Sequence, residues 1–374
     1  MRRWIARLVS LVFGVAVALT VAEVAIRVVA PQPLQHIQLD DPLYFVNRPL
    51  ARFTYAREHE YSIDVTYNAW GFRGPVPDPN APTNVTRILL IGDSQTEGLQ
   101  VRYEETYGAV LQRDLERLLP GRRFEVVNLA VSAYGTHQEV LTLRRYGARV
   151  RPCWVVLGFY PGNDLSDNVR LPLVTEDANG VRLVEHRFSI GHRLWLGAKV
   201  WVASRSHLYT FVVSRIKALA SRHALSRVGV IEPVSAPVEG ESRPLRITEQ
   251  LILIARRDAQ GLGAHFMVLV IPERTQVLRP EGAPRSPLDV LEQQFTSWFG
   301  RETVLHIEAL AALRNVQQRG ERPFFPTDGH LNAIGHRVVA ELLADRLAHA
   351  IQQAKAGSDC AGTGEETAAG RRLR

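Results

Sequence analysis

The chain has 374 residues, 46% of them hydrophobic and 22% charged, so it can bury a full core and has the composition of an ordinary globular protein. Its formal net charge is +7, but the basic residues are scattered and almost all arginine, with Lys199, Lys217 and Lys355 as the only lysines. Because no Lys/Arg-rich run or known nucleic-acid motif is present, we expect no nucleic-acid partner. The two cysteines, Cys153 before an apolar run and Cys360 in a polar tail, do not predict a disulfide.

The N-terminal segment has the features of a membrane anchor. An uncharged run, Leu8–Ala22, follows several arginines, and Trp4 with snorkelling flanks can extend it to about twenty residues, the length of a membrane span. The arginines before the run and Asp40-Asp41 after it predict a cytoplasmic N-terminus and a single-pass protein with its body outside the cytoplasm, in the periplasm. A cleavable signal with Ala16-Val17-Ala18 at the cleavage site is the alternative. Since the apolar helical character continues to residue 30, we favour residues 1–30 as an uncleaved anchor.

The next segment, residues 31–84, is rich in proline, asparagine and aromatic residues and predicts a short extended arm. Residues 85–353 predict the main domain. Residues 354–374 are dominated by glycine, alanine, threonine and glutamate and predict a disordered tail.

Within the main domain, short apolar segments alternate with helical patterns. The expected strands are Arg87–Ile91, Phe124–Asn128, Trp154–Phe159, His265–Ile271 and Val304–Ile307. The expected helices are Thr106–Leu119, Gln138–Tyr146, Ile247–Ala259, Leu288–Phe299 and Asn332–Gln353. Strands separated by helices predict an α/β fold in three layers, α/β/α, around a central parallel sheet.

The regular alternation breaks in residues 167–244, which we interpret as an insertion. Asn179-Gly180 lies between two apolar runs and predicts a β-hairpin. An apolar and aromatic stripe from Trp195 to Val213 predicts one or two helices. The stripe fits simple packing onto the domain, a lid or acyl-binding wall over the site, or a surface resting on a bilayer. Residues 233–244 predict a flexible loop.

Polar residues accompany the predicted sheet at four points. Ser94 ends the first strand in Gly-Asp-Ser, small residues at 128–135 follow the second, and Asn163 follows the third, while Asp328 and His330 precede the last helix. Because open α/β sheets bind ligands at the carboxyl ends of their strands, these segments together supply a nucleophile, its base, an orienting acid and oxyanion donors. Gly-Asp-Ser alone is also ordinary turn chemistry. No residues have metal-ligand spacing, so we expect neither a metal nor another cofactor.

This set of motifs resembles the SGNH/GDSL hydrolase family, in its membrane-anchored bacterial branch. The resemblance implies a flavodoxin-like fold with Ser94 as nucleophile, His330 as general base and Asp328 as the orienting acid. It also implies that the backbone N–H groups of Ser94 and Ala133 and the side chain of Asn163 bind the oxyanion.

The resemblance covers about residues 65–350 and has two departures from the family pattern. Ala133 stands where the family has an oxyanion glycine; alanine keeps the N–H but is strained if the position needs a positive φ. Only Gly329 separates Asp328 from His330, where the family usually has two residues. In an extended loop this spacing still places both side chains on one side.

The other polar residues near the motifs are expected to be structural. Asp93 and Asp164 are expected to fix loops, and Glu97 to interact with the N-terminal dipole of a helix. His336 is expected to be a packing or capping residue, able to substitute for His330 if that side chain points away. Two further histidines have no acidic partner nearby in sequence: His137 and His265.

We therefore expect an extracytoplasmic serine esterase that hydrolyses carboxylic esters through an acyl-enzyme. Location and family analogy indicate O-acetyl groups of envelope polysaccharide, whereas the aromatic stripe favours a lipid or a longer acyl chain. The same site could serve an acyltransferase. A non-catalytic binding module of the envelope is the rival hypothesis, motivated by Ala133 and by the short spacing between Asp328 and His330. The expected partners are the acylated carbohydrate or lipid substrate and, through the N-terminal helix, the membrane.

Overall fold

The structure, a computed structural model, describes residues 2–32, 34, 36–79, 82, 84–177, 180–222, 242–280 and 282–353. The expected tail at 354–374 and almost all of the expected loop at 233–244 lie outside these residues. The chain divides into two compact units, residues 1–48 with 187–233 (unit 1) and residues 49–186 with 234–374 (unit 2).

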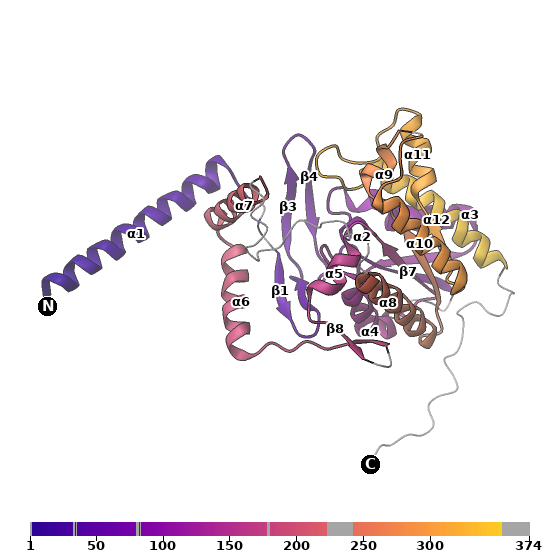
Figure 1. Ribbon diagram of the computed structural model, residues 1–374, viewed down its shortest axis with the longest axis horizontal. Coiled ribbons are helices and arrows are strands. Elements are labelled where there is room, and N and C mark those ends of the chain that lie inside the picture. The colour runs from indigo at the N-terminus through magenta and orange to yellow at the C-terminus, as the bar shows by residue number, and fades with distance from the viewer. Residues whose placement is uncertain are drawn as a thin grey trace, which may run out of the picture. The chain divides into compact units, whose positions relative to one another are not determined.

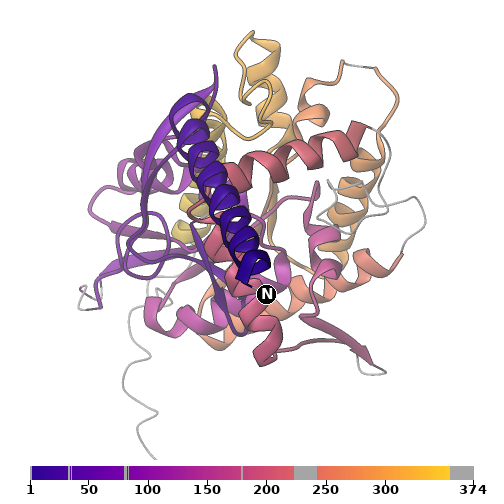
Figure 2. The same cartoon turned by 90° about the vertical axis from the view of Figure 1, so that its left-hand side faces the viewer.

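Unit 1 begins with one long apolar helix. Its elements are α1 (Arg2–Val29), β1 (Ile37–Asp40), β2 (Tyr44–Asn47), α6 (Ile190–Ala203) and α7 (His207–Arg222). The 28 residues of α1 have a mean hydropathy of 2.3 in their most apolar window and no buried side chain, so the helix is long and apolar enough for a membrane span or a signal anchor. It continues without a break past the alternative cleavage site at Ala18 (Figure 1, Figure 2). The aromatic stripe forms two helices, α6 and α7, as predicted.

Unit 2 is built on a five-stranded parallel sheet. The strands are β5 (Val85–Gly92), β6 (Arg123–Asn128), β7 (Trp154–Phe159), β10 (His265–Val270) and β11 (His306–Glu308). Their spatial order is β11-β10-β7-β5-β6, and every pairing is parallel. Numbered along the chain, this is the flavodoxin-like order 2-1-3-4-5. The predicted fold class is confirmed.

The helices of unit 2 cover both faces of the sheet (Figure 1). They are α2 (Ser94–Glu97), the 3-10 helix η1 (Tyr103–Glu105), α3 (Tyr107–Leu118), α4 (Thr136–Val150), α5 (Asp164–Arg170), α8 (Ser242–Gly261), α9 (Arg274–Leu278), α10 (Pro287–Arg301), α11 (Leu310–Gln318) and α12 (Ala333–Gln353). Ile88 and Leu90 of β5 pack in one buried cluster with side chains of α3 and α12. Because side chains alternate along a strand, Leu89 and Ile91 point to the opposite face, where α4 packs on β5.

The predicted strand Val304–Ile307 begins two residues late, at His306. Thr303 has a positive φ of 54°, and the N–H of Val304 bonds back to the carbonyl of Phe299 at the end of α10. Val304 therefore closes the preceding helix, while the carbonyl of Leu305 already accepts a hydrogen bond of 2.9 Å from the N–H of Val268 in β10.

Two β-hairpins accompany the sheet in unit 2. The predicted one is present as β8 (Val174–Asp177) and β9 (Gly180–Leu183), and its turn residue Asn179 lies outside the described residues. The second, β3 (Arg52–Arg57) with β4 (Tyr61–Thr66), occupies part of the segment expected as an extended arm. Its residues alternate polar and apolar, and the apolar side chains pack together: Phe53, Tyr55, Ile63 and Val65.

Candidate active site

The candidate nucleophile lies in a tight turn above the sheet. β5 ends at Gly92, and Ser94 is the first residue of α2. Gly92 pairs with Gly158 of β7, and Thr96 Oγ1 would lie 2.3 and 2.2 Å from a Cβ added at these two positions. Both positions must be glycine for the turn to rest directly on the strand ends.

Ser94 meets His330 although 236 residues separate them in the chain. His330 Nε2 lies 2.8 Å from Ser94 Oγ, and His330 Nδ1 is hydrogen-bonded to Asp328 Oδ1. Gly329 between the acid and the histidine has a φ of 83°. The one-residue spacing is therefore compatible with a hydroxyl–imidazole–carboxylate chain, the arrangement of a serine nucleophile with its base and orienting acid.

A glutamine connects this histidine loop to the serine turn. The side-chain oxygen of Gln95 accepts a hydrogen bond of 3.2 Å from the N–H of Leu331, and Gln95 is itself buried. The residue after Ser94 thus holds the residue after His330.

The β3–β4 hairpin holds the other side of Asp328. The Tyr61 hydroxyl donates a hydrogen bond of 2.8 Å to Asp328 Oδ2, and the Arg57 guanidinium lies 3.4 Å from the same oxygen. Burial alone would raise the pKa of Asp328, but the hydrogen bond and charge of His330, with Tyr61 and Arg57, lower it below its ordinary value. Asp328 is therefore held as a carboxylate.

Glu60, in the turn of the same hairpin, fixes the backbone of the acid loop. Its two oxygens accept hydrogen bonds from the N–H groups of Thr327, at 2.6 Å, and Asp328, at 3.0 Å. Sequence reasoning did not find Arg57, Glu60 or Tyr61. The alternating pattern of residues 52–66 could have predicted a hairpin, but no local signal shows which distant loop it contacts.

Two backbone N–H groups are available for an oxyanion. Among the described residues, neither the N–H of Ser94 nor that of Ala133 donates a hydrogen bond. Ala133 has a φ of 65°, the left-handed conformation in which glycine is unstrained and alanine is not. Ala133, which stands where the family has glycine, therefore carries the backbone strain expected of alanine at a positive φ.

Asn163 is brought to the same region, and one N–H of its amide is already engaged. Its Nδ2 donates a hydrogen bond of 3.1 Å to Asp167. An amide NH₂ has two N–H donors, so Asn163 retains one for an oxyanion.

A group of buried carboxyls lies behind Ser94. Burial raises the pKa of Asp93 and of Asp167 to about 6, and raises those of Glu139 and Asp164 well above their ordinary values. The carboxyls thus bind protons more readily than exposed ones do. Asp93 Oδ1 also accepts a hydrogen bond from the N–H of Gln95, and Asp164 Oδ2 one from the N–H of Tyr160, so both act as loop-fixing acceptors.

Glu97 lies in the first turn of α2, where the sequence placed it, and it makes buried contacts that the sequence did not predict. Glu97 is the last residue of α2, is fully buried, and accepts hydrogen bonds from the Tyr67 hydroxyl at 2.8 Å and the Ser132 N–H at 2.7 Å. It connects Tyr67, which follows β4, with Ser132 in the loop after β6.

His336 is buried and caps α3. Its Nδ1 accepts a hydrogen bond of 3.2 Å from the N–H of Tyr107, and burial lowers its pKa to about 3. His137 is also buried; its Nδ1 lies 3.1 Å from Asn168 Oδ1, and burial lowers its pKa to about 4. His265 is exposed and its ring lies 4.7 Å from that of Trp154.

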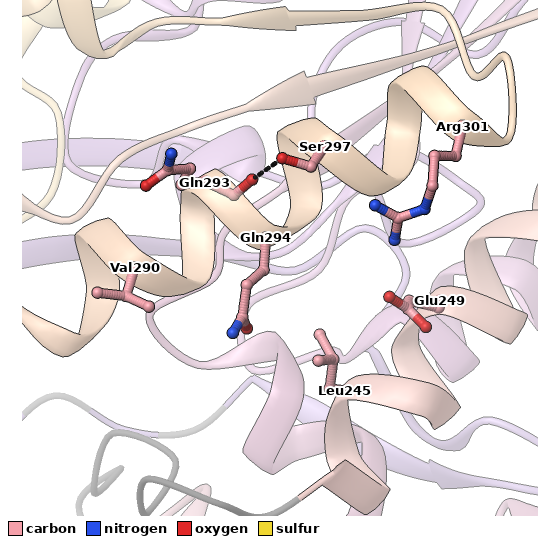
Figure 3. A pocket seen from close by; sticks show the side chains of 7 residues that line it. All are labelled: Leu245, Glu249, Val290, Gln293, Gln294, Ser297 and Arg301. Carbon is pink, nitrogen blue, oxygen red and sulfur yellow. Dashed lines mark hydrogen bonds between the residues drawn. The ribbon is translucent and has the colours of Figure 1, made fainter.

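A separate surface cleft of about 430 Å³ lies between α8 and α10 (Figure 3). It is lined by Leu245, Glu249, Val290, Gln293, Gln294, Ser297 and Arg301. None of the residues Ser94, Asp328 and His330 lines it, so this cleft is separate from the serine–histidine pair. Among the residues that the structure describes, no group of three or more metal-binding side chains could hold a metal ion.

Ser94 follows the first strand of this flavodoxin-like sheet, and Asp328 and His330 precede its last helix, in the order that the sequence motifs predicted. A family model described as "SGNH hydrolase-like domain, acetyltransferase AlgX" matches residues 233–371. This range contains Asp328 and His330 and excludes Ser94. The predicted resemblance to the SGNH/GDSL hydrolases is confirmed.

Solved structures similar to this chain include TesA and two esterases. TesA has 16% identity and a TM-score of 0.39, covering 70% of this chain and 98% of its own. The psychrotrophic esterase EstA from Pseudoalteromonas sp. has 10% identity and a TM-score of 0.40, covering 71% of this chain and 99% of its own. A catalytic mutant of an acetylxylan esterase from Geobacillus stearothermophilus has 14% identity and a TM-score of 0.37, covering 70% and 94%. No curated protein sequence matches the chain.

Proposed function

We propose that the protein is an enzyme that transfers acyl groups from carboxylic esters through a nucleophilic serine. The observation that carries this proposal is the 2.8 Å contact between Ser94 Oγ and His330 Nε2, with Nδ1 of the same ring bonded to Asp328. Such a chain lets the imidazole take the hydroxyl proton as the oxygen attacks, while the carboxylate stabilises the imidazolium.

The reaction has two steps. Ser94 Oγ attacks the ester carbonyl while His330 takes its proton; the tetrahedral intermediate then collapses, and His330 gives that proton to the departing alcohol. Water, deprotonated by His330, attacks the acyl-serine, and the proton returns to Ser94 as the acid leaves. The N–H groups of Ser94 and Ala133 bind the oxyanion, and the second N–H of the Asn163 amide can join them, since the first donates to Asp167.

Transfer to an alcohol is a second candidate outcome for the same acyl-enzyme. It is favoured by the family model, whose description names an acetyltransferase. The first step is unchanged, and an acceptor hydroxyl replaces water in the second. The acyl group is then acetyl and the acceptor a sugar hydroxyl, as in an acylated polysaccharide of the cell envelope.

We also propose that α1 is an uncleaved anchor that places the catalytic domain outside the cytoplasm. Support comes from the unbroken helix through residue 29 and from the arginines that precede its apolar run. The intact mass of the protein extracted from membranes tests this, because cleavage near residue 18 would remove about 18 of 374 residues from a 41.9 kDa chain, or about 2 kDa.

The test of the chemistry is labelling with a fluorophosphonate probe, comparing wild type with Ser94→Ala, His330→Ala and, as a control, Ser297→Ala on α10. We expect labelling of wild type and the control, and a loss of roughly 10⁴-fold or more in rate in the two site variants. A folded wild type that does not react with the probe would contradict the proposal and favour the binding-module hypothesis. Release of free acetate from an acetyl ester, with and without a sugar acceptor, separates hydrolysis from transfer.

A further inference from the structure

Helices α6 and α7 of unit 1 expose large apolar side chains. These are Ile190, Leu194, Trp195, Trp201, Val212 and Ile216. Trp195 is 63% exposed and Trp201 58%, although tryptophan is highly buried on average. A patch of this kind in a globular unit marks a surface that contacts something apolar.

The charge on this surface has one sign. Residues 188–222 contain six lysine and arginine residues and no aspartate or glutamate. Among the described side chains, Arg193 pairs with Asp41, while the other cations stack on aromatic rings. The stacked pairs are Lys199 on Trp195 at 5.5 Å, Arg205 on Trp201 at 4.9 Å and Arg215 on Phe211 at 5.1 Å. Aromatic rings next to cations, without acids, are typical of a segment that lies at the boundary between water and an anionic bilayer.

The start of α7 is fixed to the end of α1. Glu23 of α1 accepts hydrogen bonds from the Ser206 hydroxyl at 2.7 Å and from the N–H groups of His207 and Leu208, both at 2.9 Å. Arg27, one turn further, donates to Glu23 and to the carbonyl of Arg205, each at 2.9 Å. Thus α1 caps the N-terminus of α7 (Figure 1).

The position of Glu23 sets the depth of this junction. It follows the uncharged run of α1 directly, so in a spanning helix it lies within about one turn, roughly 5 Å, of the outer end of the apolar span. The first turn of α7 must then lie at the membrane surface, and α6 is joined to it by only three residues, 204–206.

We propose that α6 and α7 rest in the headgroup layer of the bilayer that α1 spans, and that this layer is anionic. The tryptophans enter the boundary between headgroups and acyl chains, and Lys199, Arg205 and Arg215 contact lipid phosphates. The inference rests on the anchor proposed above and is independent of the ester chemistry. Unit 2 or a second copy of the chain are the other possible occupants of this surface.

The test uses the full chain in nanodiscs, with a Cys360→Ser background in which Cys153 is buried. A fluorophore (NBD) is attached to a cysteine at Leu194→Cys or Trp201→Cys, and at Glu341→Cys on α12 as a control. Quenching by lipids that carry a spin label in the headgroup or at a shallow acyl position reports direct lipid contact. Intact mass confirms that the anchor is uncleaved.

We expect quenching at least 3-fold stronger at positions 194 and 201 than at 341, and stronger with phosphatidylglycerol than with phosphatidylcholine alone. Replacing Lys199 and Arg205 together by glutamine should remove the lipid dependence. The inference would be overturned if, in a chain of full mass, the labels at 194 and 201 were quenched no better than the control label. This holds whether the two labels lie in water or are covered by protein. A shortened mass would instead reject the anchor itself.

Discussion

The hydroxyl of Tyr61 donates a 2.8 Å hydrogen bond to Asp328 Oδ2, while His330 bonds to the other oxygen of the same carboxylate. The two contacts fix the rotation of the carboxylate about its side-chain bond. Tyr61 therefore acts on the candidate base indirectly, by orienting the acid that orients it.

Tyr61→Phe should lower kcat/KM for an ester by up to about tenfold, because a hydrogen bond to a charged group contributes about 1.5–3 kcal/mol and only part of it reaches the transition state. KM should change little, since Tyr61 contacts the acid and not the acyl group. Tyr146→Phe, in an aromatic cluster with Trp70 and Phe72, is the matched control. Equal rates for both variants would show that the contact to Asp328 has no role in turnover.

Glu60→Gln should loosen the acid loop, because an amide offers one acceptor where the carboxylate offers two to Thr327 and Asp328. We expect a loss of about 1.5–3 kcal/mol in stability and a fall in kcat/KM. Glu58→Gln changes the same charge on a side chain that is 89% exposed and should have no effect. Thermal unfolding and ester turnover measure both, and a variant as stable as the control would contradict the role of Glu60.

Ala133→Gly should stabilise the protein by about 1 kcal/mol, because it relieves the left-handed strain of a residue with a φ of 65°. Turnover should be retained or raised, since the backbone N–H is unchanged. The control is Ala130→Gly, a buried alanine of the same loop without a positive φ, which should destabilise. Denaturant unfolding of the two variants tests this prediction. An Ala133→Gly variant that is less stable than wild type would contradict backbone strain at Ala133.

Gly158→Ala should be severely destabilising, by about 1–3 kcal/mol or more, since its Cβ would lie 2.2 Å from Thr96 Oγ1. Removing that oxygen with Thr96→Ala should recover part of the loss in the double variant. A double-mutant cycle on unfolding free energy tests the clash. Additive effects of the two changes would argue against it.

His336 predicts a pH dependence of stability. Its pKa is about 3 in the folded protein against 6.5 ordinarily, so the stabilisation is complete above pH 6.5 and is lost as the pH falls toward 3. Between pH 7.5 and 5.5 this histidine alone should cost about 1.4 kcal/mol. Over this pH interval the free energy of unfolding of the wild type should therefore fall by about 1.4 kcal/mol more than that of His336→Gln. Chemical denaturation of both proteins in detergent measures the difference. Parallel losses in the two proteins would exclude His336 as the source.

Much of unit 2 could be predicted from the sequence. The strand Trp154–Phe159 is found within its expected bounds because six consecutive buried residues followed by a proline and a glycine leave few alternatives. The position of Ser94 at the carboxyl edge of the sheet also follows from general rules, whereas His330 follows the helix α11, and its role beside Ser94 was implied by the family resemblance.

The remainder depended on contacts that local patterns do not encode. Tyr61 reaches Asp328 across 267 residues of chain, and nothing near either residue in the sequence indicates the other. Glu97 lies in the first turn of α2, as expected, but its buried hydrogen bond to Tyr67 is a contact that the local sequence pattern does not show. In both cases tertiary packing decided the role of a polar side chain.

The β3–β4 hairpin has a practical consequence for anyone shortening the chain. A truncation at Val85, where the first strand of the sheet begins, would retain Ser94, Asp328 and His330. It would also retain all five strands of the parallel sheet. It would nonetheless lack Tyr61 and Glu60, and so would release the acid loop from its outer support. A soluble version intended for assay or crystallisation should therefore start no later than Pro49, where unit 2 begins.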